Sequence, residues 1–166
     1  MKLIILSVFA LLNFISCAEL QPLKNKNPGS GKFNLSLEVI EPGITDELHN
    51  KIKSHISMRA VLRKGLIESD LFKSIVNFNG DLQLRVINNG KDEIQEVEFL
   101  DIRHKLKLTF ILLKDKKEIY KKDFIADEIA TASEKFMAVE RIRFATEKAT
   151  YRCLEQFLED ISKQKL

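Results

Sequence analysis

Three histidines are the side chains with which this chain could bind a metal or transfer protons near neutral pH. His49 and His55 fall on the polar flank of a helical pattern, where a histidine is usually solvated. His104 stands between Arg103 and Lys105, whose charges would repel a metal cation. The three histidines also lack the spacing of a ligand pair. We therefore predict no metal site.

Two pairs of acidic residues stand close together in the sequence, Glu96 with Glu98 and Glu159 with Asp160. Both have the surroundings of solvated charges on a strand and on a helix. The sequence contains no HExxH, CxxC, P-loop, GxSxG or dinucleotide-binding motif. We therefore predict a protein that is not an enzyme, with no catalytic residue and no cofactor. An enzyme with an unrecognised site stays open as an alternative, and a deep cleft with converging polar groups would indicate it.

Cys17 has the most specific chemistry, because it follows a short apolar leader. Lys2 gives the leader a positive start, residues 3–15 are largely apolar, and the sequence FISC ends it. The stretch is shorter than the roughly 20 residues that span a bilayer, so it predicts an export signal. This lipobox-like ending predicts cleavage after residue 16, acylation of Cys17 by palmitate or a similar chain, and a lipid-anchored protein. Phe14 stands where most lipoboxes have Leu, Val or Ile, and the alternative is an ordinary secretory signal.

The composition indicates one globular domain after the leader. Of the 166 residues, 45% are hydrophobic, and 27 Lys and Arg stand against 24 Asp and Glu. So weak a charge imbalance excludes nucleic acid as an expected partner. Cys153 lies in a helical pattern and is expected to be a small buried apolar residue. We expect a signal peptide over residues 1–16, the lipidated cysteine and a flexible polar tether over 17–32, and a single α/β domain over 33–166.

Hydrophobic periodicity predicts the first elements of this domain. Residues 33–40 alternate as a half-buried strand does. An apolar residue recurs every fourth position from Ile44 to Ile56, which predicts a helix from residue 45 to about 62, ended by Gly65. Residues 66–80 have no single period, and only a short strand near residues 75–78 is suggested.

A second group of patterns predicts a hairpin. Residues 82–86 alternate and end in a turn at 88–90, and a longer strand region is expected over 94–113. Its even positions from Leu106 to Leu112 are apolar, whereas Lys105 and Lys107 face the other way. A turn near Asp115 and a return over residues 118–127 complete an antiparallel pair.

The last element is the most regular. A stripe with helical spacing predicts a helix ending near residue 162. The stripe consists of Ile142, Ala145, Ala149, Cys153, Phe157 and Ile161. Together the patterns predict an α+β two-layer sandwich, in which two amphipathic helices pack on one face of a mostly antiparallel sheet of about four strands.

Basic residues gather around the predicted hairpin. They are Arg103, Lys105 and Lys107 on the first strand, Lys114, Lys116 and Lys117 at the turn, and Lys121 and Lys122 on the return. Such a group could bind phosphates or acidic loops. Lysines also protect sheet edges from aggregation, and this alternative stays open. The strand trio is our first choice, because its three side chains share one face.

Several stretches resemble the LPS-assembly lipoprotein family LptE, in the branch that begins with CGFxPLY. CAELQPL corresponds to that beginning, Arg103 to the arginine that opens the hairpin, and the AVERIRFATEKA and LEDI segments to the closing helix. The order of these motifs matches over nearly the whole mature chain. This chain departs from the family in having Lys24 and Phe136 where tyrosines are usual.

The resemblance implies an outer-membrane lipoprotein on the periplasmic side. Members of the family plug the LptD β-barrel, assist its folding and help deliver LPS to the cell surface. The implied partners are an LptD-type barrel and LPS, and the candidate contacts are Arg103, Lys105, Lys107, Lys116 and Lys117. The alternative is a non-enzymatic accessory lipoprotein of another envelope transporter or scaffold.

Overall fold

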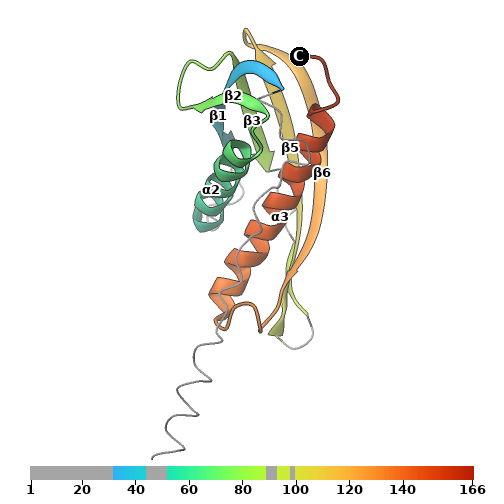
Figure 1. The fold of residues 1–166 in the computed structure, drawn as a ribbon. Helices are drawn as coiled ribbons and strands as arrows, with labels where there is room; N and C mark the ends of the chain where they lie inside the picture. The colour runs from blue at the N-terminus through green and yellow to red at the C-terminus, as the bar shows by residue number, and fades with distance from the viewer. Residues whose placement is uncertain (1–31, 44–51, 89–92, 98–99) are drawn as a thin grey trace, which may run out of the picture.

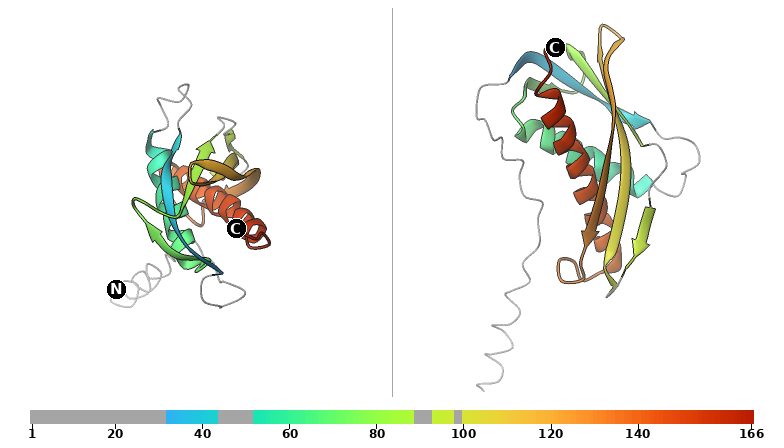
Figure 2. Two further views of the ribbon diagram at one scale, coloured as in Figure 1. Left: turned by 90° about the horizontal axis from the view of Figure 1, so that it is seen from above. Right: turned by 90° about the vertical axis from the view of Figure 1, so that its right-hand side faces the viewer.

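The computed structural model describes residues 32–43, 52–88, 93–97 and 100–166, which form a two-layer α+β fold (Figures 1 and 2). The elements in chain order are β1 (Phe33–Gly43), α2 (Ile52–Glu68), β2 (Phe72–Val76), β3 (Leu82–Asn88), β4 (Glu93–Glu96), β5 (Ile102–Lys114), β6 (Lys117–Ala130) and α3 (Ala138–Ile161). Side chains of both helices join one core with those of the sheet. The predicted α+β class with two helices is confirmed. Cys17 and the predicted leader and tether lie outside the described residues.

The sheet differs from the predicted one in size and in strand direction. It has six strands rather than about four, and β1 runs parallel to both β2 and β3. The other pairings, β3 with β5, β4 with β5 and β5 with β6, are antiparallel. The sheet is therefore mixed, because α2 lies between β1 and β2 in the chain and a helical crossover returns the chain to a parallel neighbour. Alternation along one strand does not reveal the direction of its neighbour.

Helix α2 ends later than predicted. Gly65 does not terminate it but lies inside it, buried, between the core residues Leu62 and Leu66. Burial of these leucines outweighs the helix penalty of one glycine, which is about 1 kcal/mol. The predicted start at residue 45 lies outside the described residues. The stretch without a period contains the end of α2 and strand β2.

The predicted strand region over residues 94–113 is two strands. Strand β4 folds back on β5, with Glu93 opposite Lys105 and Glu96 opposite Ile102. Leu100, which has φ 67°, lies in the connection between them. The reversal leaves no trace in the sequence, because residues 94–113 contain neither Gly nor Pro and leucine is not a typical turn residue.

The β5–β6 hairpin is confirmed and is the longest strand pair of the sheet. Asp115 and Lys116 form its turn, and both have positive φ, 50° and 64°, as a type I′ turn requires. The even residues of β5 face the helices, and Phe110 and Leu112 there are fully buried. The return strand continues past the predicted end at residue 127 to Ala130.

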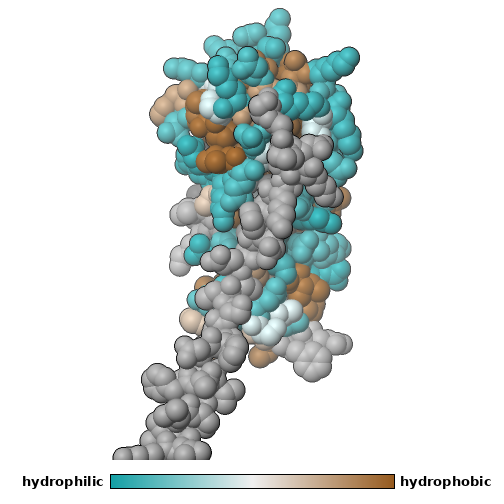
Figure 3. Space-filling model, viewed as in Figure 1, coloured by the Kyte–Doolittle hydropathy of each residue, from teal (hydrophilic) through white to brown (hydrophobic). Residues whose placement is uncertain are grey.

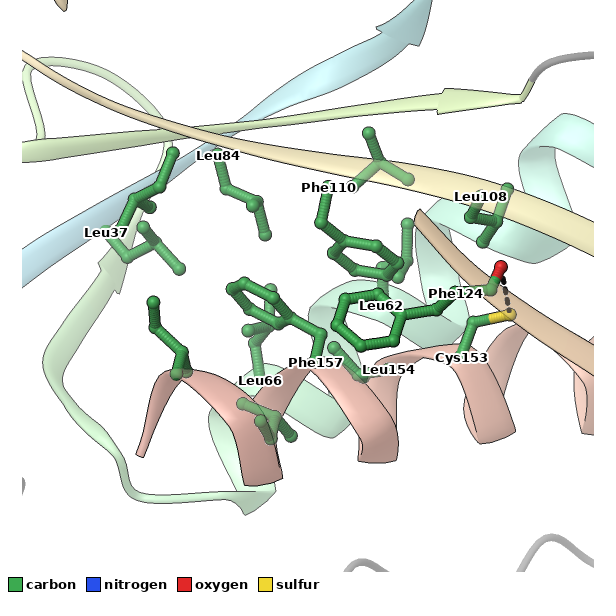
Figure 4. Close-up of a cluster of buried hydrophobic side chains, with 14 of the residues drawn as sticks. Leu37, Leu62, Leu66, Leu84, Leu108, Phe110, Phe124, Cys153, Leu154 and Phe157 are labelled. Carbon is green, nitrogen blue, oxygen red and sulfur yellow. Dashed lines mark hydrogen bonds between the residues drawn. The ribbon is translucent and has the colours of Figure 1, made fainter. Parts of the chain in front are cut away.

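Helix α3 buries the predicted stripe, with one exception. The other five residues of the stripe, from Ala145 to Ile161, are fully buried. Among them, Phe157 stacks on Phe110 with 4.7 Å between the ring centroids (Figure 4). The prediction for Ile142 was wrong, since 39% of this residue is exposed and Arg141 is buried in its place. Arg141 points inward because its guanidinium donates hydrogen bonds to the carbonyl oxygens of Lys135 and Phe136 in the loop before the helix.

Candidate interaction surfaces of the long hairpin

The outward face of β5 carries the predicted basic trio, and acidic residues of β6 accompany it. Arg103 makes two hydrogen bonds to the carboxylate of Asp127, one of them from Nε at 2.7 Å. The pair lowers the pKa of Asp127. Lys105 is exposed and lies opposite Asp127 in the register.

Lys107, the third member of the trio, is also paired. Its ammonium lies 2.6 Å from the carboxylate of Asp123, which accepts a second hydrogen bond, also 2.6 Å long, from Thr109. These bonds, the one from Lys107 first, lower the pKa of Asp123. The strand trio does share one face, as predicted, but Arg103 and Lys107 are compensated by aspartates of β6, and Lys105 lies opposite Asp127. Exposed ion pairs of this kind contribute little to stability, about 0 to 1 kcal/mol.

The turn lysines have a different environment. Lys116 and Lys117 are exposed, and among the described residues neither forms an ion pair with a carboxylate. Lys114 lies directly opposite Lys117 in the register, so three like charges stand at the turn beside Asp115 and Glu118. The lysines at the turn are therefore better placed to bind an external anion than the strand trio.

Other strands add to the same end of the sheet. Asp81, which precedes β3, accepts hydrogen bonds from the backbone and side chain of Ser36 in β1, at 2.8 and 2.7 Å. Lys73 of β2 and Lys114 of β5 both act on this carboxylate through their charges. Asp81 thus joins β1 to β3 through Ser36, and its single negative charge is shared between the two lysines.

The end of α3 is attached to β6 near the turn. Asp160 accepts hydrogen bonds from Tyr120, at 2.8 Å, and from Lys122, at 2.6 Å. The bond from Lys122 is the main cause of the lowered pKa of Asp160, and burial together with Asp160 raises the pKa of Tyr120. The carboxylate pair Glu159 and Asp160 thus has a structural role here, with Glu159 bound to Lys163.

Helix α3 also covers part of the free edge of β6. Lys148 donates a hydrogen bond to the carbonyl oxygen of Ile129 at 2.6 Å, and Gln156 donates one to that of Ile125 at 3.1 Å. Occupied edge carbonyls cannot accept bonds from an added strand. Helix α3 therefore hinders pairing of another strand with β6 at these positions.

The base of the hairpin, opposite the turn, is held by a polar clamp. Arg141, of which 5% is exposed, donates hydrogen bonds to the carbonyl oxygens of Lys135 and Phe136. Glu134 accepts bonds from the backbone of Thr131 at 2.7 Å and from Lys148 at 3.1 Å. The loop between β6 and α3 is thus fixed by side chains at several points.

Large apolar side chains protrude from this clamped loop and its surroundings. Phe136 is 92% exposed, Val139 71%, Leu100 59% and Met137 56%. Apolar atoms reach the surface at this lower end of the molecule (brown in Figure 3). This surface was not among the sites predicted from the sequence. A signal was present, because Phe136, Met137 and Val139 stand together just before the buried stripe begins.

The remaining candidates for chemistry are structural. The side chain of His104 lies on the helix-covered face of β5, whereas those of Arg103 and Lys105 lie on the opposite face. Its Nδ1 lies 3.0 Å from Thr146 Oγ1. Burial raises the pKa of Cys153 to about 12, and its thiol contacts the carbonyl of Phe124. Within the described ranges no group of His, Cys, Asp or Glu could hold a metal ion. No helix in those ranges is long and apolar enough to cross a membrane. His49 and the side chain of His55 lie outside the described residues.

Comparison with known proteins identifies the fold. No family model matches the sequence, and no curated protein is similar to it. The solved structure of XCC0632 from Xanthomonas campestris, of the family DUF330, has TM-score 0.63 and 12% identity and covers 89% of this chain and 93% of its own. A candidate lipoprotein from Caulobacter crescentus has TM-score 0.54 and 10% identity, covering 80% and 88%.

Uncharacterised lipoprotein B from Nitrosomonas europaea has TM-score 0.50 and 12% identity, covering 84% of this chain and 91% of its own. At such low identities these similarities show a shared fold. They extend over nearly the whole described domain of this chain and nearly the whole of the other chains.

Proposed function

We propose that this chain is a lipid-anchored lipoprotein of the outer membrane that plugs an LptD-type β-barrel, assists its folding and takes part in LPS transport. The observation that carries the proposal is the difference in burial and polarity between the two faces of the sheet. The helices bury most of one face, whereas the other presents charged side chains such as Arg85, Lys105 and Asp127 together with the exposed Ile119, Ile125 and Ile129 of β6. Barrel lumens are lined by polar side chains, so a polar sheet face suits enclosure there.

Three further observations support the proposal. The leader ends in a lipobox-like cysteine, Cys17, and the motif order resembles that of the LptE family. The fold occurs in proteins that are described as lipoproteins. On the outward face, Arg103 forms an ion pair with Asp127, and Lys107 forms one with Asp123. Enclosure of this face would therefore bury paired charges at these positions, which costs less than burial of single charges.

The test is purification of the lipidated protein from its own membranes in a gentle detergent. An LptD-type barrel should purify with it. If another envelope transporter component purifies instead, the protein is an accessory lipoprotein of that system and the barrel proposal is wrong. Mass spectrometry of the amino-terminal peptide should show acylated Cys17, and an unmodified thiol would contradict the anchor.

Charge reversal tests whether the outward face makes the contact. The double variant Lys105→Glu and Lys107→Glu should reduce recovery of the barrel, or LPS binding, in a salt-dependent manner while the melting temperature changes little. The matched control is Arg59→Glu with Lys64→Glu, which makes the same change of charge on the exposed side of α2. Equal recovery with both variants would exclude the outward face.

A further inference from the structure

The start of the domain and the hairpin turn lie at the same end of the molecule. In the register, Leu37 of β1 lies beside Leu82, and Leu82 lies opposite Lys114. The residues of β1 that precede Leu37, back to Phe33, therefore extend past this row toward the hairpin turn. Figures 1 and 2 show the first residues of β1 at that end, together with the carboxyl terminus.

This end, which we call the basic tip, carries more cations than anions. It contains Lys32, Lys73, Lys114, Lys116 and Lys117 against Asp70, Asp81, Asp115 and Glu118. The ammonium of Lys32 lies 5.5 Å from the ring centroid of Phe33, directly where the described domain begins. The sequence before it, from Ala18 to Lys32, adds Lys24 and Lys26 against the single acidic residue Glu19. The net charge of this segment is therefore positive, like that of the tip.

The length of chain before the domain favours one end of the molecule for contact with a membrane at Cys17. The 15 residues from 18 to 32 span at most about 54 Å when fully extended, and a coil of that length has an average end-to-end distance of about 22 Å. Helix α3, with 24 residues, is about 36 Å long and leads from the tip to the opposite, apolar end. The tip is therefore within ordinary reach of the anchor, and the apolar end is a helix length further away.

We propose that the basic tip docks on the phosphate headgroups of the bilayer that holds the lipid anchor, so that α3 stands away from the membrane and the exposed Phe136 points away from it. This orientation is that of the anchored protein before it enters a barrel, so the proposal rests on acylation of Cys17 but not on a barrel partner. The tip lysines fit this role because anionic headgroups attract cations within a Debye length of the surface. They also have few partners within the described domain.

A pair of fluorescence reporters tests the orientation. The chain contains no Trp, so one introduced Trp is a unique reporter. Ile119→Trp places it near the tip and Phe136→Trp at the opposite end, and both positions are exposed. The lipidated protein is reconstituted into vesicles of phosphatidylethanolamine and phosphatidylglycerol, free of LPS, that contain a headgroup spin label. We expect emission of Ile119→Trp to fall at least about twofold and that of Phe136→Trp to change little, since quenching needs contact with the surface.

The opposite result would show that the apolar end inserts into the bilayer and would overturn the proposal. Equal, weak quenching of both reporters would also overturn it, because the domain would then have no preferred contact. Loss of barrel co-purification with tip quenching retained would refute the proposed function and leave the orientation standing.

Charge neutralisation tests the attraction without the anchor. Unacylated protein beginning at Cys17 is sedimented with the same vesicles. Lys116→Gln with Lys117→Gln should weaken binding about fivefold per lysine at low salt, and not at all on phosphatidylcholine vesicles. Arg59→Gln with Lys64→Gln on α2 is the matched control and should bind as the wild type does. If the tip and control variants bind equally, the tip is not the membrane contact.

Discussion

The two halves of the β5–β6 hairpin are stabilised by different means. The half near the turn lies over a large apolar cluster, in which Phe110, Phe124 and Phe157 pack together (Figure 4). Among the described residues, the half near the base lies over a smaller cluster of Ile102, Ala130, Phe144 and Ala145. Polar side chains complete the base, with Arg141, Glu134 and Lys148 as the clamp.

Along the hairpin, the residues that stabilise the fold are therefore different from those that are available for binding. Near the turn, apolar burial is large, so stability there depends little on Lys116 and Lys117, which remain available to a partner. At the base, charged side chains are used to hold the loop, and apolar side chains are exposed instead. The hairpin is thus basic at one end and apolar at the other.

We expect the largest loss of stability from a substitution in the apolar cluster near the turn. Phe157→Ala should lower the free energy of unfolding by about 3 to 5 kcal/mol, because it removes the ring that contacts Phe110, Phe124 and Tyr120 and leaves a cavity. Denaturant unfolding followed by circular dichroism measures the loss. The control is Ile125→Ala on the exposed face, which should cost far less. Similar losses in the two variants would mean that this cluster does not dominate stability.

A smaller effect is expected at the clamp. Arg141→Met removes a charged donor of two hydrogen bonds to carbonyl oxygens, which should cost about 1.5 to 3 kcal/mol. Hydrogen exchange should accelerate in residues 131–137 more than near the turn. The matched control is Arg143→Met, which removes only an exposed pair with Glu147 and should change little. Uniform acceleration over the whole hairpin would contradict separate stabilisation of its halves.

The smallest effect is a response of the base to acid. Partial burial raises the pKa of Glu134, but hydrogen bonds from Thr131 and Lys148 outweigh it, so the pKa lies below the usual 4.5. A lowered folded pKa means that the stabilisation is complete above about pH 4.5 and is lost as the pH falls through the folded value. Because both side chains of the Glu134–Lys148 pair remain about a quarter exposed, the loss should stay below about 1 kcal/mol.

Amide resonances measured by NMR between pH 6 and pH 3 should therefore shift in residues 131–135 as Glu134 is protonated. Glu134→Gln should abolish this step and leave the titrations of Asp123 and Asp127 unchanged. If the loop signals follow those two aspartates instead, the clamp is not an independent unit.

The elements that could be predicted were those with a local repeat. The alternation over residues 82–86, the hairpin around Asp115 and the stripe from Ala145 to Ile161 each carry their structure in their own spacing. Burial of one face requires only that the period of the side chains match that of the backbone, so a short window is sufficient. The basic trio could be placed on one face for the same reason.

Distant contacts decided the rest. Parallel pairing of β1, the reversal of β4 and the burial of Arg141 in place of Ile142 depend on partners that no local window contains. The same holds for the candidate surfaces. Asp127 compensates Arg103 from 24 residues away, and Lys73 comes to lie near Lys114 only because the strand order places both at one end of the sheet. Which residues are basic and which face they share follows from the local pattern. Which of their charges are neutralised follows from the folded arrangement, because pairing depends on distances in space.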